Sequence, residues 1–128
     1  VFFGADASGS VSNDELQRMC AELDVVRKSG GNTYYASWDM DCETPVLVKQ
    51  NGFVGKRTKC GGTSLDSALN KANETLNKNK YDLVVIATDG YIPDITVKCH
   101  RPVLIIITKD GNMDFGNPYN YKVVQIND

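Results

Sequence analysis

The sequence predicts an α/β fold of three layers, a mainly parallel central sheet with an antiparallel edge and helices on both faces. Three short runs are largely apolar, as strands buried in a parallel sheet are: residues 1–5, 81–88 and 102–108. Stretches with apolar residues at helical spacing lie between the first two runs. Strands that alternate with helices, joined by right-handed crossovers, form such a sheet. With 128 residues, the chain suffices for one domain, residues 1–128, and not for two.

The first part of the chain predicts a strand, a helix and a second strand. After residues 1–5 (VFFGA), Ser12 and Glu15 have the S-x-x-E spacing of a capping box, in which two residues satisfy each other's backbone N–H groups. The helix that they begin has an apolar stripe formed by Leu16, Met19, Cys20, Leu23 and Val26. The glycine pair at 30–31 ends this helix. Residues 32–39 (NTYYASWD) are expected to form the second strand.

The remaining elements complete the sheet. Residues 45–50 are expected to form a strand, with a hairpin turn at 51–52 and a return at 53–58, which together give the antiparallel edge. A glycine-rich loop at 60–64 leads into a second helix, whose apolar stripe is Leu65, Ala68, Leu69, Ala72 and Leu76. After the strands at 81–88 and 102–108, a last strand is expected at residues 121–126.

Composition narrows the classes of function. Lys and Arg total 14 and Asp and Glu total 16, so a net charge of −2 gives no basic surface for nucleic acid. No apolar run approaches the roughly 20 residues of a membrane span, and no signal peptide opens the chain. The four cysteines form no C-x-x-C pair and His100 is the single histidine, so neither a zinc site nor a required disulfide framework is expected. We expect free thiols in the cytoplasm, and a chain cut from a longer protein, because an apolar strand begins at Val1.

Side chains with oxygen donors gather where predicted elements meet the carboxyl edge of the sheet. Asp6, Ser8 and Ser10 follow the first strand, Thr63 precedes the second helix, and Asp89 follows the strand at 81–88. Ligands of open α/β sheets bind at this edge, near the point where the strand order reverses. Two carboxylates and three hydroxyls, without sulfur or imidazole, suit a hard cation: Mg²⁺, Mn²⁺ or Ca²⁺. Few of them would coordinate directly, which favours Mg²⁺ because it keeps several waters.

Each part of this set also has a more ordinary interpretation. Residues 6–10 could cap a helix, but Ser12 is better placed for that role. Thr63 could cap the second helix, although Ser64 could do so instead, and Asp89 with the following glycine is a common turn. The three parts together, each at the correct end of its element, favour a metal site.

Two neighbouring segments could rim that site. Trp38, Asp39 and Asp41 are expected to end a strand and pack locally. The loop at 91–94 follows Asp89 and exposes Tyr and Ile, so it is a candidate for part of a partner-binding surface. His100 is expected at the surface rather than as a ligand.

The complete pattern resembles the metal-ion-dependent adhesion site (MIDAS) of von Willebrand factor A (VWA) domains, which have a Rossmann-like three-layer fold. All five positions of that motif are present in matching order, as Asp6, Ser8, Ser10, Thr63 and Asp89. The segments GGTSLDSAL, VVIATDGYIPD and RPVLIIITKDG look like those of compact VWA-like domains, mainly bacterial or from phage. Those domains form the C-terminal part of metallopeptidase-type proteins, often encoded beside MoxR-type AAA+ ATPases. The likeness covers nearly the whole chain.

The resemblance implies a binding module rather than an enzyme. The five residues would hold Mg²⁺, or Mn²⁺ or Ca²⁺, directly or through water, and an Asp or Glu of a protein partner would fill the open position. An AAA+ ATPase is a candidate partner, whereas nucleic acid and membrane are not expected. No H-E-x-x-H motif occurs, so any zinc peptidase site would lie outside these residues.

Two alternatives come from other classes of function. A Mg²⁺-dependent phosphatase of the haloacid dehalogenase type also places an Asp after its first strand, and Asp89 with Asp94 imitates its later acidic pair. That enzyme needs a D-x-D motif where this chain has Ser8, and a lysine beside the phosphate, for which the sequence offers no clear candidate. The other alternative is a VWA scaffold whose ion only stabilises the fold.

Overall fold

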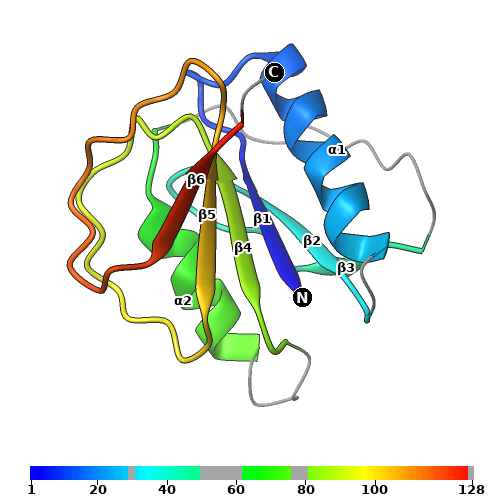
Figure 1. Ribbon diagram of the computed structural model, residues 1–128. Coiled ribbons are helices and arrows are strands. Elements are labelled where there is room, and N and C mark those ends of the chain that lie inside the picture. Colours follow the sequence, from blue (N-terminus) through cyan, green and yellow to red (C-terminus); the bar gives the residue numbers. More distant parts are fainter. Residues whose placement is uncertain (29–30, 50–61, 76–80, 127–128) are drawn as a thin grey trace.

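The computed structural model describes residues 1–28, 31–49, 62–75 and 81–126, whose strands form one twisted sheet (Figure 1). The strand order is β3-β2-β1-β4-β5-β6, and every neighbouring pair is parallel except β2 with β3. The strands are β1 (Phe2–Asp6), β2 (Tyr34–Trp38), β3 (Val46–Leu47), β4 (Val84–Thr88), β5 (Val103–Ile107) and β6 (Lys122–Gln125). The predicted α/β fold, with a mainly parallel sheet and an antiparallel edge, is therefore confirmed.

Two helices cover opposite faces of this sheet. Helix α1 (Asn13–Lys28) begins at the predicted capping box, in which the Ser12 N–H donates to Glu15 Oε1 and the Glu15 N–H donates to Ser12 Oγ, both at 3.1 Å. Helix α2 (Leu65–Thr75) lies across the sheet from α1 (Figure 1). Neither helix in the described residues is long and apolar enough to cross a membrane.

The core has two parts, one on each face of the sheet. On one face, the apolar stripe of α1 packs against alternate residues of the strands, among them Phe3, Ala5, Val85 and Ala87. On the other face, α2 packs against the remaining strand residues, among them Phe2, Trp38, Val84 and Ile86. All five residues of β1 and all five of β4 are buried, as the apolar runs predicted for strands covered on both sides.

The second half of the molecule departs from the predicted alternation of strands and helices. The connections from β4 to β5 and from β5 to β6, residues 89–102 and 108–121, contain no helix. Instead, Ile95 and Cys99 are buried beside α2, together with partly buried Phe115. Prolines and glycines in both connections, which interrupt helices, account for the difference.

The antiparallel edge is shorter than expected. In the described residues, the strand that pairs with β2 here is Val46–Leu47, where residues 45–50 were expected to form a strand, and both residues are exposed at the sheet edge. The expected hairpin turn at 51–52 and its return at 53–58 lie outside the described residues, as does Leu76 of the second apolar stripe.

The strand order reverses between β1 and β4. From β1 the chain proceeds to β2 and β3 on one side, and from β4 to β5 and β6 on the other. The carboxyl ends of β1 and β4 therefore flank the point at which open α/β sheets bind ligands. Asp6 ends β1, and Asp89 directly follows β4.

Candidate metal site

The loop after β1 turns tightly around the Asp6 carboxylate. Asp6 is fully buried, and the backbone N–H of Ser8 donates to its Oδ1 at 2.8 Å. The hydroxyl oxygens of Ser8 and Ser10 lie 3.2 Å apart, within hydrogen-bond distance. Ser8 is buried and Ser10 is exposed, so the D-x-S-x-S segment leads from the sheet edge to the surface.

The loop after β4 fixes Asp89 beside Asp6. Asp89 is 3% exposed, its Oδ1 accepts the Tyr91 N–H at 3.1 Å, and its carbonyl oxygen accepts the Asn112 N–H at 2.8 Å. Gly90 has a positive φ of 80°, and a Cβ there would lie 1.8 Å from the Asn112 carbonyl oxygen. Only glycine fits between these two loops, so the Asp-Gly pair has a structural reason.

Thr88 connects the two loops and was not among the predicted site residues. Its hydroxyl donates to Asp6 Oδ2 at 2.7 Å and accepts the Gly90 N–H at 3.1 Å, and the side chain is fully buried. The available signal was a hydroxyl residue at the end of an apolar strand, next to a candidate ligand and beside β1 in the sheet. Thr88 thus joins the Asp6 carboxylate to the loop that carries Asp89.

Thr63 reaches this edge by another route. The Ser64 N–H donates to the Asp39 carbonyl oxygen at 2.8 Å, and Asp39 directly follows β2, the neighbour of β1. Thr63 is half-buried, and in the described residues its side chain forms no hydrogen bond to the other four candidate ligands. The structure thus brings Asp6, Ser8, Ser10 and Asp89 together, and in the described residues Thr63 lies on the same edge without a hydrogen bond to them.

The expected local role of the residues after β2 is confirmed. Asp39 Oδ1 accepts the Asp41 N–H at 3.0 Å, and Trp38 is fully buried. In the loop after β4, Asp94 Oδ1 accepts the Gly116 N–H at 2.9 Å. Asp94 therefore fastens a distant loop and does not form an acidic pair with Asp89, whereas Tyr91 is 60% exposed beside the site.

Two buried carboxylates, Asp6 and Asp89, lie close enough here for their charges to interact. In the part of the chain that the structure describes, no Lys, Arg or His forms an ion pair with Asp6 or Asp89. Burial raises the pKa of Asp6, hydrogen bonds from Ser8 and Thr88 oppose this rise, and the charge of Asp89 adds to it. Burying unpaired charge is costly, and a divalent cation between the carboxylates would offset that cost.

The donor set fits such a cation. Among the residues described, no group of three or more His, Cys, Asp or Glu side chains could hold a metal, so any site here depends on the two carboxylates and the serine hydroxyls. Carboxylate and hydroxyl oxygens, completed by water, are ligands that Mg²⁺ accepts. Asp89 Oδ2 accepts no hydrogen bond in the described residues and is the freest of the four carboxylate oxygens.

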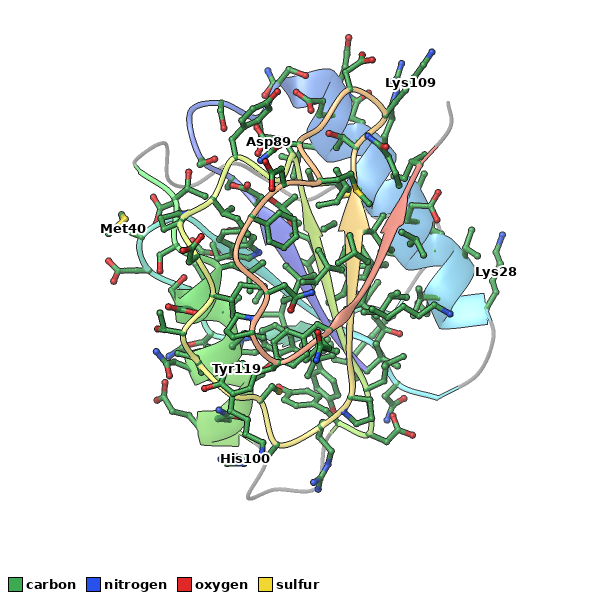
Figure 2. The ribbon with its side chains drawn as sticks, turned by 60° about the vertical axis from the view of Figure 1, so that its left-hand side comes forward. Lys28, Met40, Asp89, His100, Lys109 and Tyr119 are labelled. Carbon is green, nitrogen blue, oxygen red and sulfur yellow. The ribbon has the colours of Figure 1, made fainter. Side chains whose placement is uncertain are left out.

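A cavity of about 410 Å³ opens next to these ligands. It is bordered by Ser10 and Asp89, by Tyr91, by the start of α1 with Arg18, and by residues 108–110 after β5. Lys109 is exposed in this cavity (Figure 2), although the sequence offered no clear candidate for a lysine beside the site. Proximity of residues 108–110 to α1 arises from the sheet order and could not be read from sequence spacing.

Comparisons with known proteins agree with the fold. Residues 1–127 match the family described as VWA-like domain (DUF2201). A solved structure, an aerotolerance-related membrane protein from Bacteroides fragilis NCTC 9343, is similar with a TM-score of 0.57 at 13% sequence identity. The similarity covers 83% of this chain and 65% of that one, so the chain spans less than two thirds of that structure. At this identity, the likeness concerns the fold alone. No curated protein sequence matches the chain.

Proposed function

Because the chain belongs to the family of VWA-like domains (DUF2201), we propose that it is a protein-binding module that depends on a divalent metal ion. In this proposal, Asp6, Ser8, Ser10, Thr63 and Asp89 hold Mg²⁺, or Mn²⁺ or Ca²⁺, directly or through water. An Asp or Glu of the partner then completes the coordination. VWA-like domains often take part in protein–protein interactions, and in this proposal the metal ion is the group that binds the partner's carboxylate.

One observation carries the proposal. Asp6 and Asp89 are 0% and 3% exposed, and they lie at the carboxyl ends of β1 and β4, where the strand order reverses. In the described residues, the hydrogen-bond donors to these carboxylates are neutral: the side chains of Ser8 and Thr88 and the backbone N–H groups of Ser8 and Tyr91. A pair of buried carboxylates without a cation lowers stability, which is reason to infer that the pair serves a ligand.

The charge balance favours an acidic ligand. Two carboxylates formally neutralise a divalent ion, and hydroxyls and waters fill further positions without adding charge. An ion at a partly dry sheet edge still attracts an anionic oxygen strongly, because the local dielectric is low. The partner's carboxylate would therefore displace a water, and its affinity would depend on the ion.

Binding suits the site better than phosphoryl transfer does. The phosphatase alternative requires a second acid two residues after Asp6, where Ser8 instead shares a hydrogen bond with Ser10. Lys109 and Arg18 border the adjacent cavity, so positive charge is available and the alternative merits a direct assay. Our proposal expects that Mg²⁺-loaded chain hydrolyses p-nitrophenyl phosphate no faster than the Asp6→Ala variant does.

Calorimetry tests the metal site first. Mg²⁺, Mn²⁺ and Ca²⁺ are titrated into the chelator-treated chain and into Asp89→Ala. We expect one ion to bind per native chain and none to bind the variant. A glutamate-containing peptide and its glutamine counterpart are then titrated with and without the ion. Binding of the glutamate peptide only in the presence of the ion supports the module.

Two results would overturn the proposal in different ways. If no ion binds, the metal-dependent module is wrong. The other result is that an ion binds and stabilises the chain, but no acidic peptide or protein binds the loaded chain. The ion is then structural, which is the scaffold alternative. A MoxR-type AAA+ ATPase is the candidate natural partner, tested by whether its capture is lost in EDTA and in Asp89→Ala.

A further inference from the structure

Three exposed apolar side chains lie on loops at the carboxyl edge of the sheet, where the candidate metal site lies. Among the described residues, eight large hydrophobic side chains are exposed, and three of these follow the carboxyl ends of β2, β4 and β5. These three are Met40, Tyr91 and Met113, which are 58%, 60% and 47% exposed. Exposed apolar groups gathered in one area indicate a binding surface more often than single ones do.

The backbone at Tyr91 and next to Met113 is hydrogen-bonded to Asp89. The Tyr91 N–H donates to Asp89 Oδ1 at 3.1 Å, and the N–H of Asn112, the neighbour of Met113, donates to the Asp89 carbonyl at 2.8 Å. The Asn112 Nδ2 also donates to the Gly90 carbonyl at 3.1 Å. The backbone that carries these two side chains is therefore hydrogen-bonded to Asp89, so little backbone freedom is lost when they bind a partner.

Met40 extends this apolar rim toward the third ligand-bearing loop. A Cβ placed on Gly62 would lie 3.2 Å from both Cγ and Sδ of Met40, so the thioether rests on the backbone next to Thr63. Methionine adapts its shape to different partners, and tyrosine offers a large rigid surface. The rim formed by Met40, Tyr91 and Met113 thus surrounds part of the site with side chains common in binding surfaces.

The opposite flank of the site is charged. The charged side chains that border the cavity between α1 and the loop after β5 are Arg18 and Lys109 and, besides Asp89, the carboxylates of Asp14, Glu15 and Asp110. In Figure 2, Asp89 lies between Met40 on one side and Lys109, beside the start of α1, on the other. The surface is therefore asymmetric: Met40 lies on the side of α2, the charged side chains lie on the side of α1, and Tyr91 borders the charged cavity.

From this arrangement we infer that the partner presents an acidic residue flanked by large apolar side chains, which pack on Tyr91, Met113 and Met40 while the carboxylate meets the ion. The inference rests on the proposed function and adds the chemistry of the segment that is recognised. The ion attracts the anionic group, and apolar neighbours exclude water around it, which strengthens that attraction. An acid within a polar segment would lack this contribution.

Three capped pentapeptides test the inference by NMR titration of the Mg²⁺-loaded chain. The first has a central glutamate with phenylalanine at both ends, the second has serine at both ends, and the third has glutamine in place of the glutamate of the first. We expect the first peptide to bind roughly tenfold more tightly than the second, from the apolar area that it buries. We expect the third to bind far more weakly than the first.

Variants of the rim locate the effect. Tyr91→Ala and Met113→Ala should each remove most of the advantage of the phenylalanine peptide, and Tyr91→Phe should restore it. Tyr119→Ala is the matched control, because Tyr119 is 41% exposed and lies far from Asp89 at the other end of the molecule (Figure 2). Thermal unfolding and Mg²⁺ affinity should be unchanged in Tyr91→Ala, since its side chain is exposed.

The outcomes separate the inference from the proposed function. If both glutamate peptides bind equally well and only with Mg²⁺, the function stands and the inference is wrong. The same holds if Tyr119→Ala lowers the advantage as much as Tyr91→Ala does. If the glutamate and glutamine peptides bind alike with and without the ion, the proposed function fails and the inference falls with it.

Discussion

Two regions of this molecule use aspartate in opposite ways. At the start of α2, Asp66 accepts three hydrogen bonds with its two oxygens: from the N–H and hydroxyl of Thr96, at 3.0 and 2.7 Å, and from the N–H of Val97, at 3.2 Å. At the carboxyl edge of the sheet, Asp6 and Asp89 are more deeply buried and lie close enough for their charges to interact.

The difference separates a carboxylate that stabilises the fold from carboxylates available to a ligand. Asp66 is half-buried and keeps contact with solvent, so its charge is well accommodated while it fastens the connection between β4 and β5 to α2. Asp6 and Asp89 combine burial, mutual repulsion and the absence of a cation in the described residues, which is unfavourable for the fold alone. A site that reduces stability without its ligand is a candidate functional site.

The largest expected effect distinguishes these roles directly. Asp89→Ala should weaken Mg²⁺ binding by more than the roughly 100-fold that loss of an outer-shell partner can cost, because a charged ligand is removed. Calorimetric titration of the chelator-treated variant measures this loss. In EDTA the variant should be at least as stable as the native chain, since one of two repelling buried charges is gone. Unchanged Mg²⁺ affinity would contradict the assignment of Asp89.

Asp66→Ala should show the reverse behaviour. Loss of its three hydrogen bonds is expected to cost about 2 kcal/mol of unfolding free energy, because bonds to a charged acceptor are among the stronger ones. Chemical denaturation measures this cost, and Mg²⁺ affinity measured in the same preparation should not change. If Asp66→Ala has native stability but binds Mg²⁺ more weakly, the proposed difference between Asp66 and the Asp6–Asp89 pair is wrong.

Most of the fold could be predicted from the sequence because burial on both faces leaves a clear pattern. The apolar runs at 1–5, 81–88 and 102–108 became β1, β4 and β5, and the capping box set the first turn of α1. The two helix-free connections were not predicted, because irregular segments such as 92–99 pack in the core without periodicity. Their apolar residues are fixed by contacts with α2 rather than by local propensity.

The candidate site was predictable to the extent that its residues follow recognisable strands. Asp6, Ser8, Ser10 and Asp89 meet as expected, because parallel strands end at the same edge. Thr88 was missed as a site residue because its role depends on the pairing of β4 with β1, across 82 residues of sequence. The cavity with Lys109 depends in the same way on the position of β5.

Thr88→Val tests whether a residue that positions Asp6 affects metal binding. The substitution keeps the shape of the side chain but removes the hydroxyl that donates to Asp6 and accepts from Gly90. Mg²⁺ affinity is expected to fall roughly tenfold, as for other residues that orient metal ligands.

Thr108→Val is the matched control for Thr88→Val. Thr108 is also buried after the end of a parallel strand, but its hydroxyl has no hydrogen-bond partner in the described residues. Metal affinity of Thr108→Val should equal that of the native chain. If both variants lose affinity equally, Thr88 acts through the general stability of the sheet edge rather than through Asp6.

The smallest expected effect is a pH dependence that belongs to Asp6. Its pKa in the folded chain is raised from the ordinary value of 3.8, chiefly by burial, so the folded chain keeps this proton at a pH where the unfolded chain has lost it. Stability without metal should therefore decline as pH rises from about 3.8 through the raised pKa, and the loss is complete above that pKa.

Asp6→Asn isolates this contribution, because the amide does not titrate and can still accept the Ser8 N–H. In EDTA, the unfolding free energy of the native chain minus that of Asp6→Asn should fall with rising pH across the acid range and then level off. With saturating Mg²⁺ the sign should reverse, because the ion binds the ionised carboxylate and stabilises the native chain alone as pH rises. A difference that is flat in EDTA would mean that burial does not disfavour the ionised form of Asp6. If the difference in unfolding free energy falls with pH in EDTA but does not reverse with Mg²⁺, Asp6 does not bind the ion.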